Sequence, residues 1–128
     1  MKKIIVIALM FATLFACTRK GTAFTKSINN TSSKTIHFYF YGSFNPMTYG
    51  DTVTVNPGEL KEIHSYVEEN RAVSVQQPCK IYDDSIRVEI IGGGVLNKSL
   101  INEADWEFET GTEDSQNCIF KITDADIL

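Results

Sequence analysis

The sequence of 128 residues contains no apolar run long enough to cross a lipid bilayer as a helix. Its longest such run, residues 4–15, has 12 residues, whereas a membrane span requires about 20. Lys2 and Lys3 precede this run and supply the basic start of an export signal. We therefore predict a cleaved signal peptide over residues 1–16 rather than a stable transmembrane helix.

Positive charge is also scarce, because 12 Lys and Arg residues stand against 16 Asp and Glu residues, a net charge of −4. Removing residues 1–16 takes Lys2 and Lys3 away, so 10 basic residues remain against 16 acidic ones and the charge becomes −6. Nucleic acids and anionic membrane surfaces attract clustered Lys and Arg side chains. Neither is therefore an expected partner.

Residues for acid–base chemistry are few. The two histidines, His37 and His64, are 27 positions apart and have no second metal ligand at short spacing. No Gly-x-Ser-x-Gly elbow is present, and Gly92-Gly93-Gly94 lacks the Gly-Lys-Ser/Thr ending of a phosphate loop. We expect a protein that is not an enzyme, with no catalytic residue, no metal and no cofactor.

Of the three cysteines, one directly follows the apolar run and two lie later in the chain. Leu14-Phe15-Ala16-Cys17 resembles the lipobox of bacterial lipoproteins, which implies that Cys17 is acylated and becomes the first residue of the mature chain. The alternative is an ordinary secretory signal followed by an incidental cysteine. Cys79 and Cys118 then remain as a pair for one disulfide in an oxidising compartment beyond the inner membrane.

Beyond the signal, hydrophobic residues alternate with polar ones, and turn residues interrupt the pattern roughly every 8 to 12 positions. This pattern predicts an all-β domain over residues 27–128, preceded by a polar, lipidated tether over residues 17–26. About eight strands favour a two-sheet antiparallel β-sandwich of the immunoglobulin-like or transthyretin-like kind. A small closed β-barrel is the alternative.

The first expected strand covers residues 24–29. The second covers residues 34–41, where Ile36, Phe38 and Phe40 alternate with His37, Tyr39 and Tyr41. We expect the first three to face the core. The turn Asn56-Pro57-Gly58-Glu59 should join strands 51–55 and 60–67 in a hairpin. Further strands are expected at the following places: 72–75, 85–91, and 95–101 as a strand or an extended crossing. A helical turn at 102–105 should lead into a closing hairpin of 106–110 and 117–123, with Trp106 and Phe108 inward.

The outward side chains of the second strand suggest recognition. His37, Tyr39 and Tyr41, with Phe44 and Tyr49 in the following loop, would present flat apolar area tipped by hydroxyl groups. Such a surface suits a sugar ring or a protein partner. Alternatively, a loop covers this side of the sheet, or cross-strand pairs of these residues only stabilise it.

Acidic residues gather near the end of the chain. Asp105, Glu107 and Glu109 are spaced by two, so they should share one strand face and could attract Ca²⁺ if a loop supplied further oxygens. A solvated face that keeps the domain soluble is the simpler interpretation.

Two tripeptides, Asp51-Thr52-Val53 and Asp84-Ser85-Ile86, resemble the acceptor sequence of the O-glycosylation system of Bacteroidota. The resemblance implies that Thr52 and Ser85 carry glycans. Both tripeptides also fit the starts of ordinary strands.

The order of features along the mature chain resembles that of small lipoproteins of Bacteroidota-type bacteria, which bring no assigned activity. The segments that carry this resemblance are Ile28-Asn29-Asn30-Thr31-Ser32, Thr52-Val53-Thr54-Val55-Asn56-Pro57-Gly58-Glu59, Asp84-Ser85-Ile86-Arg87-Val88, Trp106-Glu107 and Cys118-Ile119-Phe120-Lys121-Ile122-Thr123-Asp124-Ala125-Asp126.

We expect from all this a lipid-anchored, non-catalytic protein of the cell envelope with a binding or structural role, whose partner is an envelope protein or a glycan. The alternatives are an inhibitor or immunity-type protein that blocks an envelope enzyme, and a glycan-binding module. Thr18-Arg19-Lys20 has no acidic run of the kind associated with surface export in such bacteria. We therefore expect the periplasmic side rather than the cell surface. We also expect the outer membrane rather than the inner one.

Overall fold

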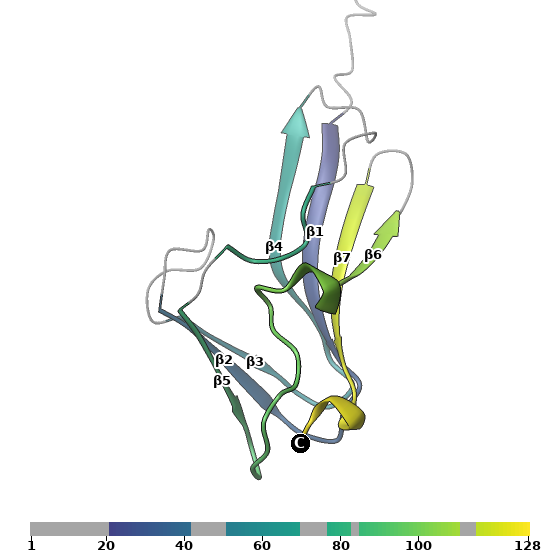
Figure 1. Cartoon of the computed structure of the whole chain (residues 1–128). Coiled ribbons are helices and arrows are strands. Elements are labelled where there is room, and N and C mark those ends of the chain that lie inside the picture. The colour runs from purple at the N-terminus through teal and green to yellow at the C-terminus, as the bar shows by residue number, and fades with distance from the viewer. Residues whose placement is uncertain (1–20, 42–50, 70–76, 83–84, 111–114) are drawn as a thin grey trace, which may run out of the picture.

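The computed structural model describes residues 21–41, 51–69, 77–82, 85–110 and 115–128. In this part of the chain, seven strands form two sheets that do not close into a barrel (Figure 1). The four-stranded sheet has the order β4 (Leu60–Glu69), β1 (Gly21–Asn30), β7 (Ser115–Ile122) and β6 (Glu107–Thr110). The three-stranded sheet has the order β3 (Asp51–Val55), β2 (Ile36–Phe40) and β5 (Ile86–Ile90). The predicted two-sheet β-sandwich is confirmed.

The four-stranded sheet is mixed rather than wholly antiparallel, which corrects the sequence-based expectation. Strand β1 runs antiparallel to β4 but parallel to β7, with Ile28 opposite Phe120. A parallel pair needs a long connection, and here strands β2 to β6 all lie between its two members in the chain. Alternation of polar and apolar residues marks a strand's faces but not its direction, so the sequence pattern did not reveal this pair.

Strand β1 begins at Gly21, earlier than predicted. Residues 21–26, assigned above to the tether, pair with β4 from Gly21 opposite Glu69 and with β7 from Ala23 opposite Ser115. Phe24 is buried, and its ring stacks on that of Tyr66 with centroids 5.0 Å apart. The expected strand at residues 24–29 covered part of this segment, and only residues 21–23 were missed in a strand that is paired on both sides.

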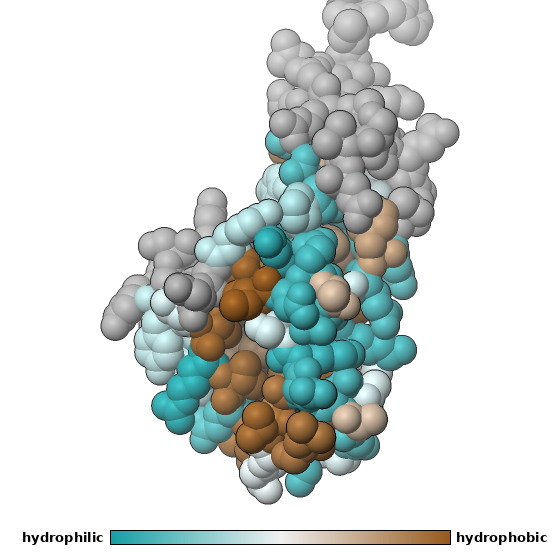
Figure 2. Space-filling view, viewed as in Figure 1, coloured by the Kyte–Doolittle hydropathy of each residue, from teal (hydrophilic) through white to brown (hydrophobic). Residues whose placement is uncertain are grey.

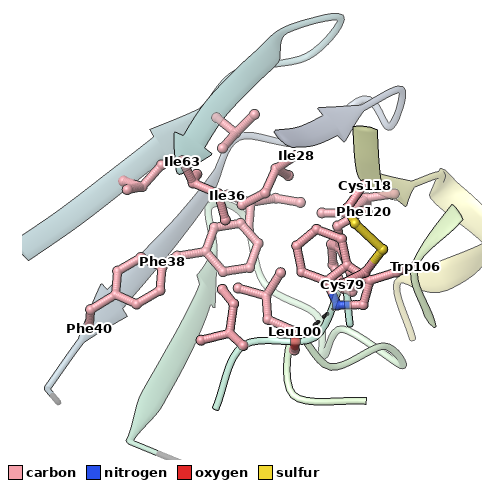
Figure 3. Packing of buried hydrophobic residues seen from close by; sticks show 14 of the residues in the cluster. Ile28, Ile36, Phe38, Phe40, Ile63, Cys79, Leu100, Trp106, Cys118 and Phe120 are labelled. Carbon is pink, nitrogen blue, oxygen red and sulfur yellow. Dashed lines mark hydrogen bonds between the residues drawn. A yellow bond between two sulfur atoms is a disulfide. The ribbon is translucent and has the colours of Figure 1, made fainter. Parts of the chain in front are cut away.

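The core lies between the two sheets and is built from the apolar residues that alternate with polar ones along the strands. Ile36, Phe38 and Phe40 of β2 are fully buried, as predicted. Burying each such side chain contributes roughly 1.5–3 kcal/mol. Trp106 packs beside the disulfide (Figure 3), with its ring centroid 5.3 Å from that of Phe120. Its indole Nε1–H donates to the Leu100 carbonyl at 2.9 Å.

The turn at residues 56–59 does not close a hairpin, contrary to the prediction. Strand β3 pairs with β2 in one sheet and β4 pairs with β1 in the other, so the turn carries the chain between sheets. It docks on Asn30, whose N–H donates to the Glu59 carbonyl at 2.9 Å and whose carbonyl accepts from Gly58 N–H at 2.7 Å. Gly58 has φ of 77°, a conformation that favours glycine.

The last part of the chain follows the prediction with one difference. Strands β6 and β7 form the closing hairpin, and the helical turn η1 (Glu103–Asp105) precedes it. Phe108 lies opposite Cys118 and so on the inner side of the sheet, yet it is 37% exposed. Strand β6 is an edge of the four-stranded sheet, so its side chains have a neighbouring strand on one side only.

Two further expected strands need comment. Residues 95–101 form no strand; their one bridge in the described structure joins Leu96 to Ile127, next to the turn η2 (Asp124–Asp126). The strand predicted at 72–75 lies outside the described residues.

Candidate functional site

The outer side of the three-stranded sheet carries the side chains predicted to form a binding face. We call this surface the outer face and define it by His37 and Tyr39 of β2, with Tyr41 directly after it. His37 and Tyr39 are half-buried, and Tyr41 is 41% exposed. The strict alternation of β2 turns these residues away from the core because its three apolar residues point into it.

Contacts from the neighbouring strand hold Tyr39 in place. Its hydroxyl donates to Glu89 Oε2 at 2.7 Å, and the Arg87 guanidinium lies 5.6 Å from the ring centroid. The hydrogen bond to Glu89 is the main reason that the pKa of Tyr39 is raised. On the other side of β2, His37 Nδ1 and Thr54 Oγ1 are 2.8 Å apart. The outer face is therefore a preset array of aromatic and polar groups.

The remaining sequence-predicted residues lie around this face. Phe44 and Tyr49 are outside the described residues. Thr52 is exposed on β3 and lies directly opposite Tyr39 in the register. Ser85 is exposed just before β5, where its carbonyl accepts from Tyr41 N–H at 2.9 Å. Both candidate glycosylation positions therefore border the outer face.

A second constellation escaped the sequence analysis: residues 77–82, which we call the clamped segment. Cys79, bonded to Cys118, and Ile81 point into the core, whereas Pro78 and Tyr82 are exposed and Lys80 is half-buried. This alternation has the period of a strand although the segment belongs to no sheet. The alternation beside the cysteine is the signal that could have revealed it.

Backbone contacts fix the clamped segment from several sides. Glu103 accepts from Cys79 N–H at 2.9 Å and from Lys80 N–H at 2.8 Å. Ile81 N–H donates to the Leu100 carbonyl at 2.9 Å. Lys26 Nζ donates to the Lys80 carbonyl at 3.0 Å, and burial lowers the pKa of Lys26 although Glu103 opposes this shift.

The first residue of the segment is held in the same way. The Gln116 side chain accepts from Gln77 N–H at 3.0 Å and donates to its carbonyl at 2.7 Å. Lys80 Nζ lies 5.0 Å from the centroid of the Tyr82 ring. An open hollow of about 410 Å³ borders these residues and Pro78. The clamped segment thus offers exposed side chains on a fixed backbone.

The histidines are not brought together, since His37 lies on β2 and His64 on β4 in the other sheet. Burial, followed by the charge of Lys26, lowers the pKa of His64. Among the described residues, no group of three or more His, Cys, Asp or Glu side chains is placed to hold a metal ion. Nor does this part of the chain contain a helix both long and apolar enough to span a membrane.

The acidic residues near the end of the chain are dispersed as well. Asp105 lies in η1 rather than on β6, so it does not share a strand face with Glu107 and Glu109 as predicted. Its carboxylate accepts from Ser99 N–H at 2.8 Å.

The carboxylates that follow β7 also serve the backbone. Asp124 accepts from Ser33 N–H and Asp126 from Thr123 N–H, both at 2.8 Å. These residues fix turns, which gives them a structural use.

Comparison of the chain with protein-family models, with curated proteins and with solved structures found no match.

Proposed function

We propose that this chain is a lipid-anchored, non-catalytic protein of the cell envelope that binds a partner through the outer face. The observation that carries the proposal is the fixed position of Tyr39 between Glu89 and Arg87. A side chain that is already ordered loses little conformational freedom on binding, so its contact area is used more fully. The aromatic ring and its polar neighbours suit an envelope protein first and a glycan second.

The start of β1 supports an anchor that keeps the domain close to the membrane. Only residues 18–20 separate Cys17 from Gly21, where the sheet begins. Four extended residue steps span at most about 14 Å. The start of β1 and the C-terminus lie at opposite ends of the molecule (Figure 1). With a lipid on Cys17, the C-terminal end would therefore point away from the bilayer.

The disulfide between Cys79 and Cys118 fits an oxidising compartment such as the periplasm. It supports export of the domain, as the predicted signal peptide requires.

Glycosylation and binding would compete on the same surface. Because Thr52 lies opposite Tyr39 and Ser85 bonds to Tyr41, a glycan at either hydroxyl would crowd the outer face. A protein molecule that carries either glycan would therefore have a covered outer face and would not bind the partner there. Intact mass of the protein from its native envelope, compared with Thr52→Ala and Ser85→Ala, tests whether either site is used.

An affinity experiment with matched tyrosine variants tests the binding proposal. The mature domain is immobilised and exposed to envelope extract, and the retained proteins are compared with those retained by Tyr39→Ala/Tyr41→Ala. Tyr82→Ala is the control, because Tyr82 is an exposed tyrosine on a different surface, 74% accessible. We expect the wild type and the control to retain the same partner, and the double variant to lose it. Retention by all three, with unchanged melting temperatures, would contradict the proposal. Elution by soluble glycan would identify a glycan-bearing partner.

The clamped segment favours a second candidate, an inhibitor or immunity-type protein. Its backbone is fixed by the disulfide and by Glu103, while Pro78 and Tyr82 remain exposed. Such a segment can enter an enzyme cleft at little cost in ordering. In the same affinity experiment, loss of the partner with Tyr82→Ala and Lys80→Glu, but not with the outer-face variant, would favour this candidate.

A further inference from the structure

Strand β5 is an edge of the three-stranded sheet, and its outer backbone groups face away from β2. Tyr41 N–H donates to the Ser85 carbonyl and Ile91 N–H to the Thr35 carbonyl, each at 2.9 Å. Hydrogen-bonded pairs alternate along an antiparallel ladder. The N–H and C=O groups of residues 86, 88 and 90 therefore point outward. Among these outward groups, only the Ile90 carbonyl has a hydrogen-bond partner within the described chain, the Gly93 N–H at 3.0 Å.

The side chains of this edge are apolar on the inner side and charged on the outer side. Ile86 and Val88 face the core but are only partly buried, unlike Phe38 on the neighbouring strand. Figure 2 shows apolar side chains gathering along this side of the molecule, where Figure 1 places β5 and the segment after it. Arg87 is exposed and Glu89 half-buried on the opposite face. Within the described residues no strand pairs with the outer side of β5, and the free backbone groups of such an edge are a template for another strand.

We propose that the occupant of this edge is β5 of a second copy of the chain, paired antiparallel around a two-fold axis at Val88. In this register Arg87 lies opposite Glu89 of the second copy, and Glu89 opposite its Arg87, so both cross-strand pairs have opposite charges. Ile86 lies opposite Ile90 of the second copy. The outward N–H and C=O of Val88 meet those of its counterpart in a hydrogen-bonded pair.

Neighbouring registers are unfavourable, which makes the pairing specific. An axis at Arg87 or at Glu89 would place like charges directly opposite each other, which destabilises a sheet. Such an axis would also place at the centre of the dimer a residue whose backbone N–H and C=O groups are already hydrogen-bonded to β2. Of these three centres, only the Val88 axis satisfies both charge and hydrogen bonding at the axis.

The dimer would contain one continuous sheet of six strands, three from each copy. Both edges β5 would be covered, and the partly exposed Ile86 and Val88 would gain apolar neighbours. The two outer faces would lie side by side on one surface. The pairing does not depend on what the outer face binds, so the two proposals can fail separately.

Charge reversal tests the pairing directly. The mature chain, residues 17–128 with Cys17→Ser, is studied by sedimentation equilibrium, alone and with Arg87→Glu, Glu89→Arg or both. The chain that carries Cys17→Ser alone is expected to be a dimer. Each single reversal makes both cross-strand pairs like-charged and should raise the dimer dissociation constant about tenfold or more. The double reversal restores opposite charges and should restore the dimer.

Two further variants separate association from folding. Tyr39→Phe removes the internal hydrogen bond to Glu89 without changing any edge charge, and should dimerise as the parent does. Val88→Pro removes an outward N–H, which an edge strand tolerates, and should leave a folded monomer by thermal melting. A parent chain that stays monomeric up to millimolar concentration would overturn the proposal and leave the edge to a strand of another protein. A dimer that is indifferent to the reversals, or one that the double reversal does not restore, would overturn it equally.

Discussion

Replacing Asn30 with alanine should destabilise this domain more than any other single change of a polar residue that we consider. Asn30 is completely buried at the end of β1. Its Nδ2 donates to the carbonyls of Lys34 at 2.7 Å and Val55 at 3.1 Å. Its Oδ1 accepts from the N–H of Ser32 at 3.1 Å and from its hydroxyl at 2.6 Å. The side chain thus joins the end of the four-stranded sheet to β3 in the other sheet.

The size of the effect follows from these four hydrogen bonds. Each contributes about 1 kcal/mol net, and a buried group left without a partner costs about 1–3 kcal/mol more. Ser32 Oγ can still reach the Lys34 carbonyl, at 3.4 Å, so not every group is left unpaired. We expect Asn30→Ala to lower the free energy of unfolding by about 4 kcal/mol.

Asn29 provides a matched control, because it precedes Asn30 on the same strand and points to the other face. It is half-buried and has no side-chain hydrogen bond within the described part of the chain. Asn29→Ala should change the free energy of unfolding by no more than about 0.5 kcal/mol. Urea unfolding of both variants, followed by Trp106 fluorescence, measures the difference. Equal effects of the two replacements would refute the role given to Asn30.

Three other changes test other parts of the fold. Phe38→Ala empties a fully buried core position and should cost about 3–5 kcal/mol in urea unfolding; a loss below 1 kcal/mol, on the order of a surface change, would mean that the core is wrongly located. The bond between Cys79 and Cys118, 39 positions apart, should stabilise the domain by about 4 kcal/mol, so the double alanine variant should melt far earlier, and an unchanged melt would argue against the bridge. Hydrogen bonds from the Ser33 N–H and hydroxyl lower the pKa of Asp124. Its contribution to stability is therefore present above the ordinary carboxyl pKa of about 4 and lost as the pH falls below it; melting temperatures of the parent and Asp124→Asn should converge in acid, and parallel pH profiles would contradict this.

The local sequence pattern was sufficient for predictions that depend on a single strand. The alternation in β2 correctly separated Phe38 from Tyr39. Assigning Cys17 to lipid left one possible disulfide, and Cys79 and Cys118 are indeed joined. Both inferences depend on residues that are close in sequence or few in number.

Pairing between distant segments was not accessible in the same way. The turn around Gly58 has the same sequence signature whether it closes a hairpin or crosses between sheets, and its actual role depends on contacts with Asn30. The clamped segment was missed because its partners, Lys26, Glu103 and Gln116, are scattered over the chain and form no motif. Such contacts become visible only when the sheets are assembled.

The fate of Cys17 decides whether the protein is anchored in a membrane, because the proposed envelope function requires a lipid at this residue. The native chain and Cys17→Ser are expressed in a bacterium with a lipoprotein-processing pathway, and their membranes are partitioned between detergent and aqueous phases. We expect the native chain in the detergent phase, with a diacylglycerol-modified N-terminal cysteine by mass spectrometry, and Cys17→Ser in the aqueous phase. An unmodified Cys17, or a Cys17→Ser protein that still enters the detergent phase, would contradict the lipid anchor.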